Sequence, residues 1–301
     1  MRTVAWRGIK GEVLADVPMK RYTSMRVGGP VSFLVYPTDE RDVIRAVRKA
    51  AQKHLPVRFF GNGTNVIVRD EGLDMVVIRP TRIRHLRHRT TSNGAVVDVS
   101  AGIPLRRLIR DCAEKGLSGL EKLFGIPGTV GGAIKMNAGS FGAWITDPLI
   151  DVTYLDTDGK ERTTAKKHIG FGYRTSSFGK ADCILSARFE LAEKARGAIM
   201  DDIDYVFTER SKRHPMEYPS AGSIFKNRER NPTWKYIDEA GLRGVRIGNA
   251  GISEKHSNFI VNLGGATAAD VVALIRKVKK EVRKHSGVML EEEIELWGFD
   301  G

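Results

Sequence analysis

Two glycine-rich stretches, Gly61-Asn62-Gly63-Thr64-Asn65 and Gly125-Ile126-Pro127-Gly128-Thr129-Val130-Gly131-Gly132-Ala133, decide how the rest of the chain is interpreted. The first stretch superficially matches a dinucleotide fingerprint, but its third glycine is absent and the next residues, Val66-Ile67-Val68, favour a strand. A Rossmann site needs a helix N-terminus at that point to receive the pyrophosphate. We therefore exclude a Rossmann site and predict a loop whose backbone N–H groups, with Thr64 and Asn65, converge on an anion.

The second stretch offers the same backbone donors over a longer path. The segment from Gly125 to Gly139 contains five glycines, with Thr129 as a further donor and with the run Met136-Asn137-Ala138-Gly139 at the end. Its pattern fits neither a helix nor a strand, so we predict an ordered loop. Each stretch alone is more typical of a glycine-bearing turn. Together they indicate a cofactor with a diphosphate and a long body, held by irregular backbone.

The composition is that of an ordinary globular protein. The 301 residues are 41% apolar, enough to fill about two or three packed units. No stretch approaches the roughly 18 apolar residues of a membrane span, and residues 1–16 lack the pattern of a signal peptide. We expect a cytoplasmic protein. Its cysteines, Cys112 and Cys183, lie in apolar patterns and are expected to be reduced core residues and not a disulfide or metal pair.

The formal net charge of +13 is compatible with nucleic acid, an anionic surface or small polyanionic ligands. The densest basic clusters, residues 79–89 and 276–284, lack the interleaved aromatic residues of a base-stacking platform and match no DNA-reading motif. We expect no nucleic-acid partner. The charge is interpreted as a solvated face or as suited to phosphate-bearing substrates.

Strands and helices intermix along the chain, which predicts the α+β class. A helix over residues 39–54 has Thr38 as its candidate cap, and a long helix opens with the capping box Thr267-x-x-Asp270. A short helix is expected to begin with Asn231 as cap and Pro232 at its first position. Other helices are predicted at 104–115 and, with Ile199, Ile203, Val206 and Phe207 inward, at 198–211. Strands are predicted at 57–60, 66–68, 75–78, 95–99, 152–155, 183–191, 257–262 and 294–297.

Several longer motifs occur in a fixed order between about residues 22 and 298. They are Tyr22-Thr23-Ser24-Met25-Arg26-Val27-Gly28-Gly29-Pro30, the two glycine-rich stretches, Leu117-Ser118-Gly119-Leu120-Glu121, Met136-Asn137-Ala138-Gly139, Gly172-Tyr173-Arg174-Thr175-Ser176-Ser177-Phe178, Ala221-Gly222-Ser223-Ile224-Phe225-Lys226-Asn227 and Ser253-Glu254-Lys255-His256-Ser257-Asn258-Phe259-Ile260-Val261-Asn262. With these motifs the chain closely resembles the UDP-N-acetylenolpyruvoylglucosamine reductases of bacterial peptidoglycan synthesis.

The resemblance implies a fold and a reaction. The fold is an FAD-binding unit of the PCMH type (vanillyl-alcohol-oxidase-like) over residues 1–192, with subdomains of about 1–55 and 56–192, and a UDP-sugar-binding domain over 193–301. NADPH would reduce non-covalently bound FAD, which would reduce the enolpyruvyl ether of a UDP-sugar to the lactyl ether of UDP-N-acetylmuramate. The expected partners are this anionic UDP-sugar and NADPH, and the expected state is a monomer.

Three residues are implied to be catalytic. Hydride transfer to the enolpyruvyl group leaves a carbanion or enolate beside a carboxylate, which needs charge stabilisation and a proton. Ser223 matches the family's proton donor, and Arg174 suits the carboxylate and the developing enolate oxygen. Glu293 matches the family's acidic residue, although the run Glu291-Glu292-Glu293 leaves the register open.

The resemblance also assigns binding residues. Those implied for the cofactor are Arg26, Gly61, Asn62, Gly63, Thr64, Asn65, Gly125, Ile126, Pro127, Gly128, Thr129, Gly131, Gly132, Asn137, Ala138 and Gly139. Those implied for the substrate are Tyr173, Arg213, Asn227 and Arg243, whereas His256 is interpreted as structural. No metal is expected.

The chain departs from the family pattern at a few positions. Asn62 replaces a common glycine, which requires either a negative φ or an asparagine that tolerates the left-handed region. Lys122, Lys135, Trp144 and Asn249 are further departures, and the tyrosine-bearing lid insertion of some members is absent. The main alternative is another FAD oxidoreductase of the same fold with a different substrate. Oxidases with covalently bound FAD usually carry histidine at the phosphate loop, and residues 61–65 have none.

Overall fold

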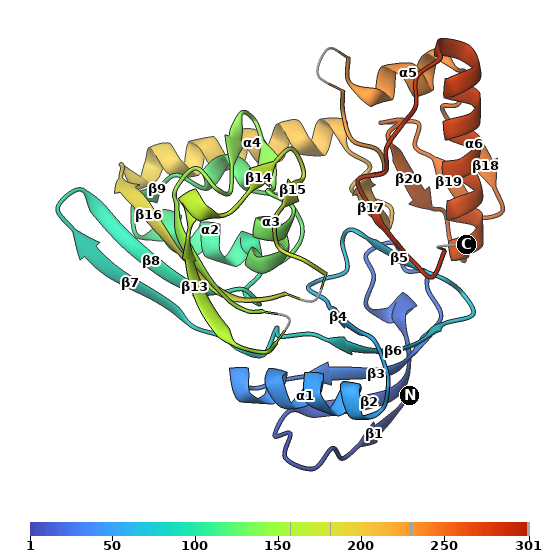
Figure 1. The fold of residues 1–301 in the computed structure, drawn as a ribbon. Helices are drawn as coiled ribbons and strands as arrows, with labels where there is room; N and C mark the ends of the chain where they lie inside the picture. Colours follow the sequence, from blue (N-terminus) through green and yellow to red (C-terminus); the bar gives the residue numbers. More distant parts are fainter. Residues whose placement is uncertain (157, 181, 229–230, 300–301) are drawn as a thin grey trace. The chain divides into compact units, whose positions relative to one another are not determined.

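The computed structural model describes residues 1–156, 158–180, 182–228 and 231–299 (Figure 1). Strands and helices intermix along the chain, which confirms the predicted α+β class. The chain divides into two compact units. Unit 1 comprises residues 1–15, 33–61 and 74–210, and unit 2 comprises residues 16–32, 62–73 and 211–301.

A five-stranded sheet and helix α1 (Glu40–Gln52) share one hydrophobic core. The strand order is β1 (Arg2–Val4), β2 (Glu12–Pro18), β3 (Pro30–Tyr36), β6 (Leu73–Ile78), β4 (Val57–Phe59). Helix α1 buries Val43, Ala46 and Ala50 in the same core as sheet residues such as Val35. Its N-cap is Asp39, which accepts a hydrogen bond from Asp42 N at 2.7 Å, so the prediction of Thr38 as cap is wrong. The Thr38 hydroxyl instead donates to the Asp42 carboxylate at 2.9 Å.

The second sheet of unit 1 is antiparallel and has the order β13-β12-β16-β8-β7, with β9 paired to β16. The bounds are β7 Leu86–Thr91, β8 Gly94–Ser100, β9 Leu117–Ser118, β12 Leu149–Leu155, β13 Glu161–Ala165 and β16 Cys183–Glu193. Helices α2 (Leu105–Glu114), α3 (Val130–Lys135) and α4 (Arg196–Arg213) share its core. Two short hairpins, β10 (Gly139–Ser140) with β11 (Ala143–Trp144) and β14 (Phe171–Gly172) with β15 (Thr175–Ser176), belong to the same unit.

Two further predictions about unit 1 are wrong. The stretch 125–133 is not loop throughout, because α3 begins at Val130 with the Thr129 side chain accepting from Gly132 N at 3.3 Å. Glycine disfavours helix, but burial of Val130 and Ile134 in the core outweighs that local preference. Phe207 was expected to face inward on α4, yet it is 39% exposed.

Both cysteines are free and buried, as predicted. Burial, followed by the neighbouring Asp111 charge, raises the pKa of the Cys112 thiol to about 12. Burial also raises the pKa of Cys183. Thiols of this kind pack as small apolar side chains and are poor nucleophiles.

Unit 2 contains a four-stranded antiparallel sheet with the order β17-β20-β19-β18. The bounds are β17 Ser220–Ser223, β18 Arg246–Ile247, β19 Ala250–Ile252 and β20 Phe259–Asn262. Helix α6 (Ala268–Ser286) packs into its core, and the predicted capping box of Thr267 and Asp270 is present. A parallel pair, β5 (Val66–Val68) with β21 (Glu295–Trp297), completes the unit.

Helix α5 (Thr233–Glu239) has Pro232 as its N-cap, so the prediction of Asn231 as cap is wrong. Thr233 N is instead satisfied by Asn227 Oδ1 at 3.0 Å. Single turns of 3-10 helix occur at Met19–Arg21, Glu121–Leu123 and Lys166–His168. Among the described residues, no helix has the length and hydropathy needed to cross a membrane.

Candidate functional site

In unit 1 the two glycine-rich stretches meet. A Cβ added to Gly61 would lie 2.7 Å from Thr129 Oγ1, so only glycine fits against the second stretch there. The Gly61 carbonyl accepts from Arg79 Nε at 2.9 Å, and Gly131 N donates to Ala101 O at 2.9 Å. Gly61 and the second stretch are therefore in contact, and each is bonded to a residue that directly follows a strand, β6 or β8.

The run 137–139 follows the second glycine-rich stretch in the sequence and is hydrogen-bonded to the hairpin that carries Tyr173 and Arg174. Asn137 is buried with φ 41°, and its side chain donates to Gly172 O at 2.9 Å and accepts from the Thr146 hydroxyl at 3.0 Å. The Asn137 side chain thus holds the β14–β15 hairpin. A Cβ on Gly139 would lie 2.3 Å from the Trp144 ring, which excludes a side chain at this position too.

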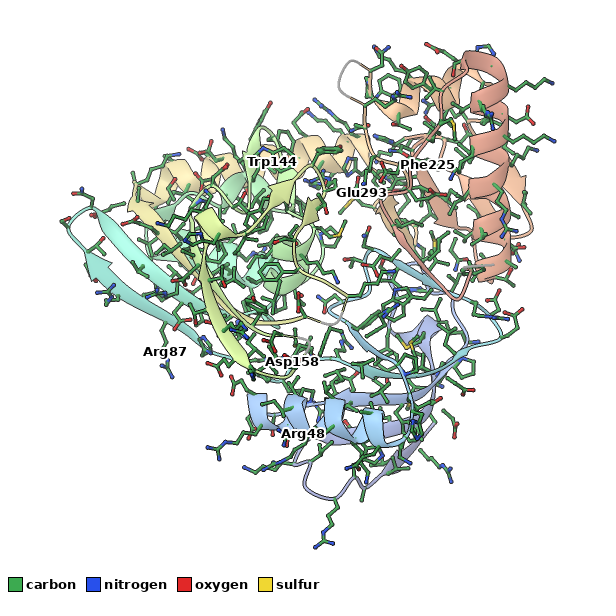
Figure 2. The ribbon with its side chains drawn as sticks, viewed as in Figure 1. Arg48, Arg87, Trp144, Asp158, Phe225 and Glu293 are labelled. Carbon is green, nitrogen blue, oxygen red and sulfur yellow. The ribbon has the colours of Figure 1, made fainter. Side chains whose placement is uncertain are left out.

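Arg174 sits in an aromatic setting on the loop of the β14–β15 hairpin. Its guanidinium carbon lies 5.8 Å from the Trp144 ring centroid and 5.4 Å from that of Tyr173, both within cation–π range. The two rings meet edge to face at 6.1 Å. Arg174 has φ 54°, a strained conformation for a residue with a Cβ. Figure 2 shows Trp144 on its short hairpin in unit 1.

A second arginine of unit 1, Arg210 on α4, was missed by the sequence interpretation. Its Nη2 donates to the Ser140 hydroxyl at 2.6 Å, while its Nε is buried and finds no acceptor among the described residues. Burial, followed by the positive charge of Arg174, lowers the pKa of Arg210 to about 10. No spacing on α4 distinguishes Arg210 from the helix's other charged residues, so the sequence held no signal for it.

In unit 2 the rest of the first glycine-rich stretch is fixed to the segment that carries Arg26. Ser24 N donates to Gly63 O at 3.0 Å, and the Ser24 hydroxyl donates to Ser220 O at 2.6 Å. Gly63 has φ 63° and Arg26 has φ 58°, whereas Asn62 has a negative φ. The negative φ explains why Asn62 can replace a glycine.

Ser223, Glu293 and Asn65 come together in unit 2. Glu293 N donates to Ile224 O at 2.8 Å, next to Ser223, and Asn65 Nδ2 donates to Glu293 O at 3.0 Å. Phe225 pairs with Glu292 as an antiparallel bridge, and Figure 2 shows Phe225 and Glu293 side by side. Strand β17 is irregular between Ser220 and Ser223, a feature that often re-aims a side chain.

The three adjacent glutamates occupy different environments. Glu291 forms an ion pair with Lys226 and is 72% exposed. Glu292 pairs with Lys279 of α6 at 2.8 Å. Of the three, only Glu293 has its main chain bonded to both the Ser223 segment and the Asn65 loop. Glu293 is therefore the glutamate of the three whose main chain links these two segments.

The remaining predicted substrate residues are more dispersed in unit 2. Arg213 is exposed, and Asn227 caps the start of α5 as described above. Arg243 pairs with Asp238 and donates to Glu254 O. His256 packs edge to face on Phe259 at 5.0 Å, and burial lowers its pKa, which suits the structural role assigned to it.

Comparison with known proteins identifies the class. An "FAD binding domain" family model matches residues 31–165, and a "UDP-N-acetylenolpyruvoylglucosamine reductase, C-terminal domain" model matches residues 214–297. The fold and site are thus those of an FAD-dependent oxidoreductase.

Relatives then identify the family. The chain is 40% identical to a UDP-N-acetylenolpyruvoylglucosamine reductase of Syntrophus aciditrophicus, over 97% of this chain and 94% of the relative. It is 41% identical to that of Geobacter sulfurreducens, over 96% and 95%. The solved reductase of Thermus caldophilus superposes with a TM-score of 0.80 at 36% identity, covering 96% of this chain and 99% of that one. The chain belongs to the UDP-N-acetylenolpyruvoylglucosamine reductase family, which confirms the resemblance and the FAD-dependent oxidoreductase class.

The described residues of unit 1 fit a bound FAD. Gly61, Gly131 and Gly139 each have a neighbour within 3 Å of an added Cβ, so the chain closes around these backbones without side chains. The buried Arg210 Nε offers an unused donor beside Gly125, the first residue of the second stretch. An anionic cofactor would give this donor an acceptor. Among the described residues, no group of three or more His, Cys, Asp or Glu side chains is arranged to hold a metal.

Proposed function

We propose that this protein catalyses the NADPH-dependent reduction of UDP-N-acetylenolpyruvoylglucosamine to UDP-N-acetylmuramate. The observation that carries the proposal is the juxtaposition of Ser223, Glu293 and Asn65 in unit 2. Hydrogen bonds that involve the main chain there bring together the segments that carry the Ser223 hydroxyl, the Glu293 carboxylate and the Asn65 amide, the kinds of group that a proton-dependent reduction next to a flavin requires.

The chain's own residues then have distinct tasks. FAD, when bound, supplies the hydride that it has taken from NADPH. The Ser223 hydroxyl donates a proton to the carbanion, and the nearby Glu293 orients the site and polarises the enol. Arg174, in cation–π contact with two aromatic rings, binds the substrate carboxylate and stabilises the developing enolate oxygen.

Other residues bind the cofactor and the UDP-sugar. We assign FAD to Arg26, to 61–65, to Gly125, Ile126, Pro127, Gly128, Thr129, Gly131 and Gly132, and to 137–139. The UDP-sugar contacts are Tyr173, Arg213, Asn227 and Arg243. The diphosphate and the carboxylate make this substrate strongly anionic, in keeping with the net charge of +13. We further propose functional domains over 1–192 and 193–301, a cytoplasmic location and a monomeric state.

The test is a coupled assay with product identification. NADPH oxidation should depend on the enolpyruvyl UDP-sugar, and mass spectrometry should find the product heavier than the substrate by two hydrogens. NADPH oxidation that is independent of this UDP-sugar, with no reduced product, would assign the chain to another FAD oxidoreductase activity.

A further inference from the structure

The side chain of Trp144 contacts both the predicted cofactor run and Arg174. Trp144 pairs with Gly139 across the β10–β11 hairpin, and a Cβ on Gly139 would collide with its ring. The guanidinium carbon of Arg174 lies 5.8 Å from the centroid of the same ring. Trp144 is also one of the positions at which the chain departs from the family pattern. One indole of unit 1 thus links two parts of the proposed site.

The backbone of Trp144 is held firmly. Its N–H donates to Asp147 Oδ2 at 2.8 Å, and its carbonyl accepts from Asp147 N at 3.0 Å. The next residue, Ile145, is buried and donates from its N–H to Ala138 O at 2.8 Å. Together with the close approach of Gly139 to the ring, these bonds fix the position from which the indole reaches Arg174.

Arg174 lies in the loop of the β14–β15 hairpin, where its φ is 54°. Its contact with the Tyr173 ring joins adjacent residues, so this contact does not tie the arginine to another part of unit 1. The contact with Trp144 does, because Trp144 belongs to a different hairpin. An arginine side chain has many rotamers, and the freedom that it has already lost does not have to be lost when a substrate binds.

We propose that Trp144 is a positioning residue for the reduction, whose indole holds the Arg174 guanidinium in place to receive the substrate carboxylate. A ring face attracts the positive charge but is not a conventional hydrogen-bond acceptor, so this contact does not consume the N–H donors that a carboxylate requires. Because the same ring packs against Gly139, the arginine is held relative to the predicted cofactor run. The inference deepens the proposed function and rests on it through the role given to Arg174.

The test is the second-order rate constant for reoxidation of the reduced flavin by the enolpyruvyl UDP-sugar, measured by anaerobic stopped flow in Trp144→Met. Methionine fills apolar space but has no ring face, so the rate constant should fall by roughly 2- to 30-fold, the equivalent of one cation–π contact. Trp144→Phe, which keeps a ring face, should recover part of the loss. If Trp144→Met does not fold, tetrafluorotryptophan at position 144 carries the same expectation, because fluorine withdraws electron density from the ring face and retains its shape.

A double-mutant cycle with Arg174→Gln separates positioning from packing. Glutamine removes the charge that the ring attracts. In this background Trp144→Met should change the rate constant by less than about twofold, because the group that Trp144 positions is gone. The matched control is Phe33→Met on β3, which also removes a ring in contact with a cation, Lys53 at 5.6 Å, and it should leave the rate constant unchanged.

A second readout needs no substrate. In the oxidised protein, the ring current of Trp144 should displace the NMR signals of the Arg174 δ-methylene protons, which are assigned by their absence in Arg174→Gln. Trp144→Met should move these signals toward their positions in free arginine.

Three results would overturn the inference. An equal loss of rate in both backgrounds would make Trp144 a packing residue only. An unchanged rate constant in Trp144→Met would remove it from the mechanism, and Arg174 signals that stay in place would exclude the contact. Failure of the proposed function shows separately, because the UDP-sugar would then not reoxidise the flavin of the unmodified protein, whereas the NMR shift would still report the contact.

Discussion

Arg26, Asn137 and Arg174, three residues of the candidate site, have φ angles of 58°, 41° and 54°. Only six non-glycine residues among those described have positive φ, so half of them are residues that we propose for the site. The left-handed conformation costs roughly 1–2 kcal/mol for a residue with a Cβ, and such strain concentrates where function requires it. Backbone strain therefore lies at three of the residues that we propose for the site.

Ser223→Ala tests the proton donor at the residue scale. The variant should retain FAD and be reduced by NADPH at the normal rate, because the hydroxyl acts only after hydride transfer to the substrate. Reoxidation of its flavin by the UDP-sugar should slow by about 10²–10⁴, measured by anaerobic stopped flow. Ser220→Ala, on the same strand, is the control and should behave normally. Wild-type-like reoxidation in Ser223→Ala would remove Ser223 from the mechanism.

At the residue scale, the sequence indicates which residues are candidates for the site, but it does not indicate the contacts that surround them. The motif supplied Ser223 and the run of three glutamates as candidates, but the different surroundings of Glu291, Glu292 and Glu293 could not be predicted, because ion pairs with Lys226 and Lys279 depend on contacts far along the chain. Arg210 was missed for the same reason. Its burial and its like-charged neighbour arise from tertiary packing that no local pattern encodes.

The secondary-structure elements that can be predicted from the sequence are those whose own residues carry a strong capping or periodicity signal. Helix α6 carries its own capping box, whose hydrogen bonds all lie within four residues. Helix α3 was missed because its Val-Gly-Gly-Ala sequence has a poor intrinsic helix preference and forms only against the core. The meeting of Gly61 with Thr129 likewise depends on residues distant in sequence.

The β10–β11 hairpin provides a packing test. Gly139→Ala places a Cβ 2.3 Å from the Trp144 ring and should lower the free energy of unfolding by about 1–3 kcal/mol in denaturant titrations. In a Trp144→Ala background the same substitution should cost much less, because the clash is gone. Gly197→Ala on α4, where nothing lies within 4 Å of the added Cβ, is the control and should be neutral or stabilising by up to about 1 kcal/mol. An equal cost of Gly139→Ala in both backgrounds would contradict the clash.

The start of helix α1 provides a pH test. Burial opposes ionisation of Asp42, but hydrogen bonds from Lys10 N, Thr38 and Gly11 N outweigh it, and they hold its pKa below the ordinary 3.8. Because the pKa of Asp42 is lower in the folded state than in the unfolded state, its ionised carboxylate stabilises the fold. This stabilisation is complete well above pH 4 and is lost as the pH falls through the folded-state pKa. Asp42→Asn should lower the free energy of unfolding at pH 7 by about 1–3 kcal/mol and flatten its decrease below pH 4. Asp201→Asn, at an exposed position, is the control. An unchanged acid profile in Asp42→Asn would exclude this linkage.

At the scale of the whole molecule, the net charge of +13 should speed the association of the protein with a polyanionic substrate. Salt shortens the reach of electrostatic attraction to about 10 Å at 0.1 M ionic strength. The kcat/KM for the UDP-sugar should therefore fall as NaCl rises from about 20 to 500 mM, while kcat changes little. Sodium sulfate at equal ionic strength is the control and should give the same decrease. A kcat/KM that is independent of salt would mean that the charge does not steer this substrate.

The central claim is that one FAD accepts hydride from NADPH and passes it to the enolpyruvyl UDP-sugar. The most direct measurement is the flavin absorbance of the purified protein under anaerobic conditions, first with one equivalent of NADPH and then with the UDP-sugar. We predict that NADPH bleaches the flavin and that the UDP-sugar restores its colour with formation of UDP-N-acetylmuramate. A flavin that NADPH bleaches but the UDP-sugar leaves reduced would contradict the account.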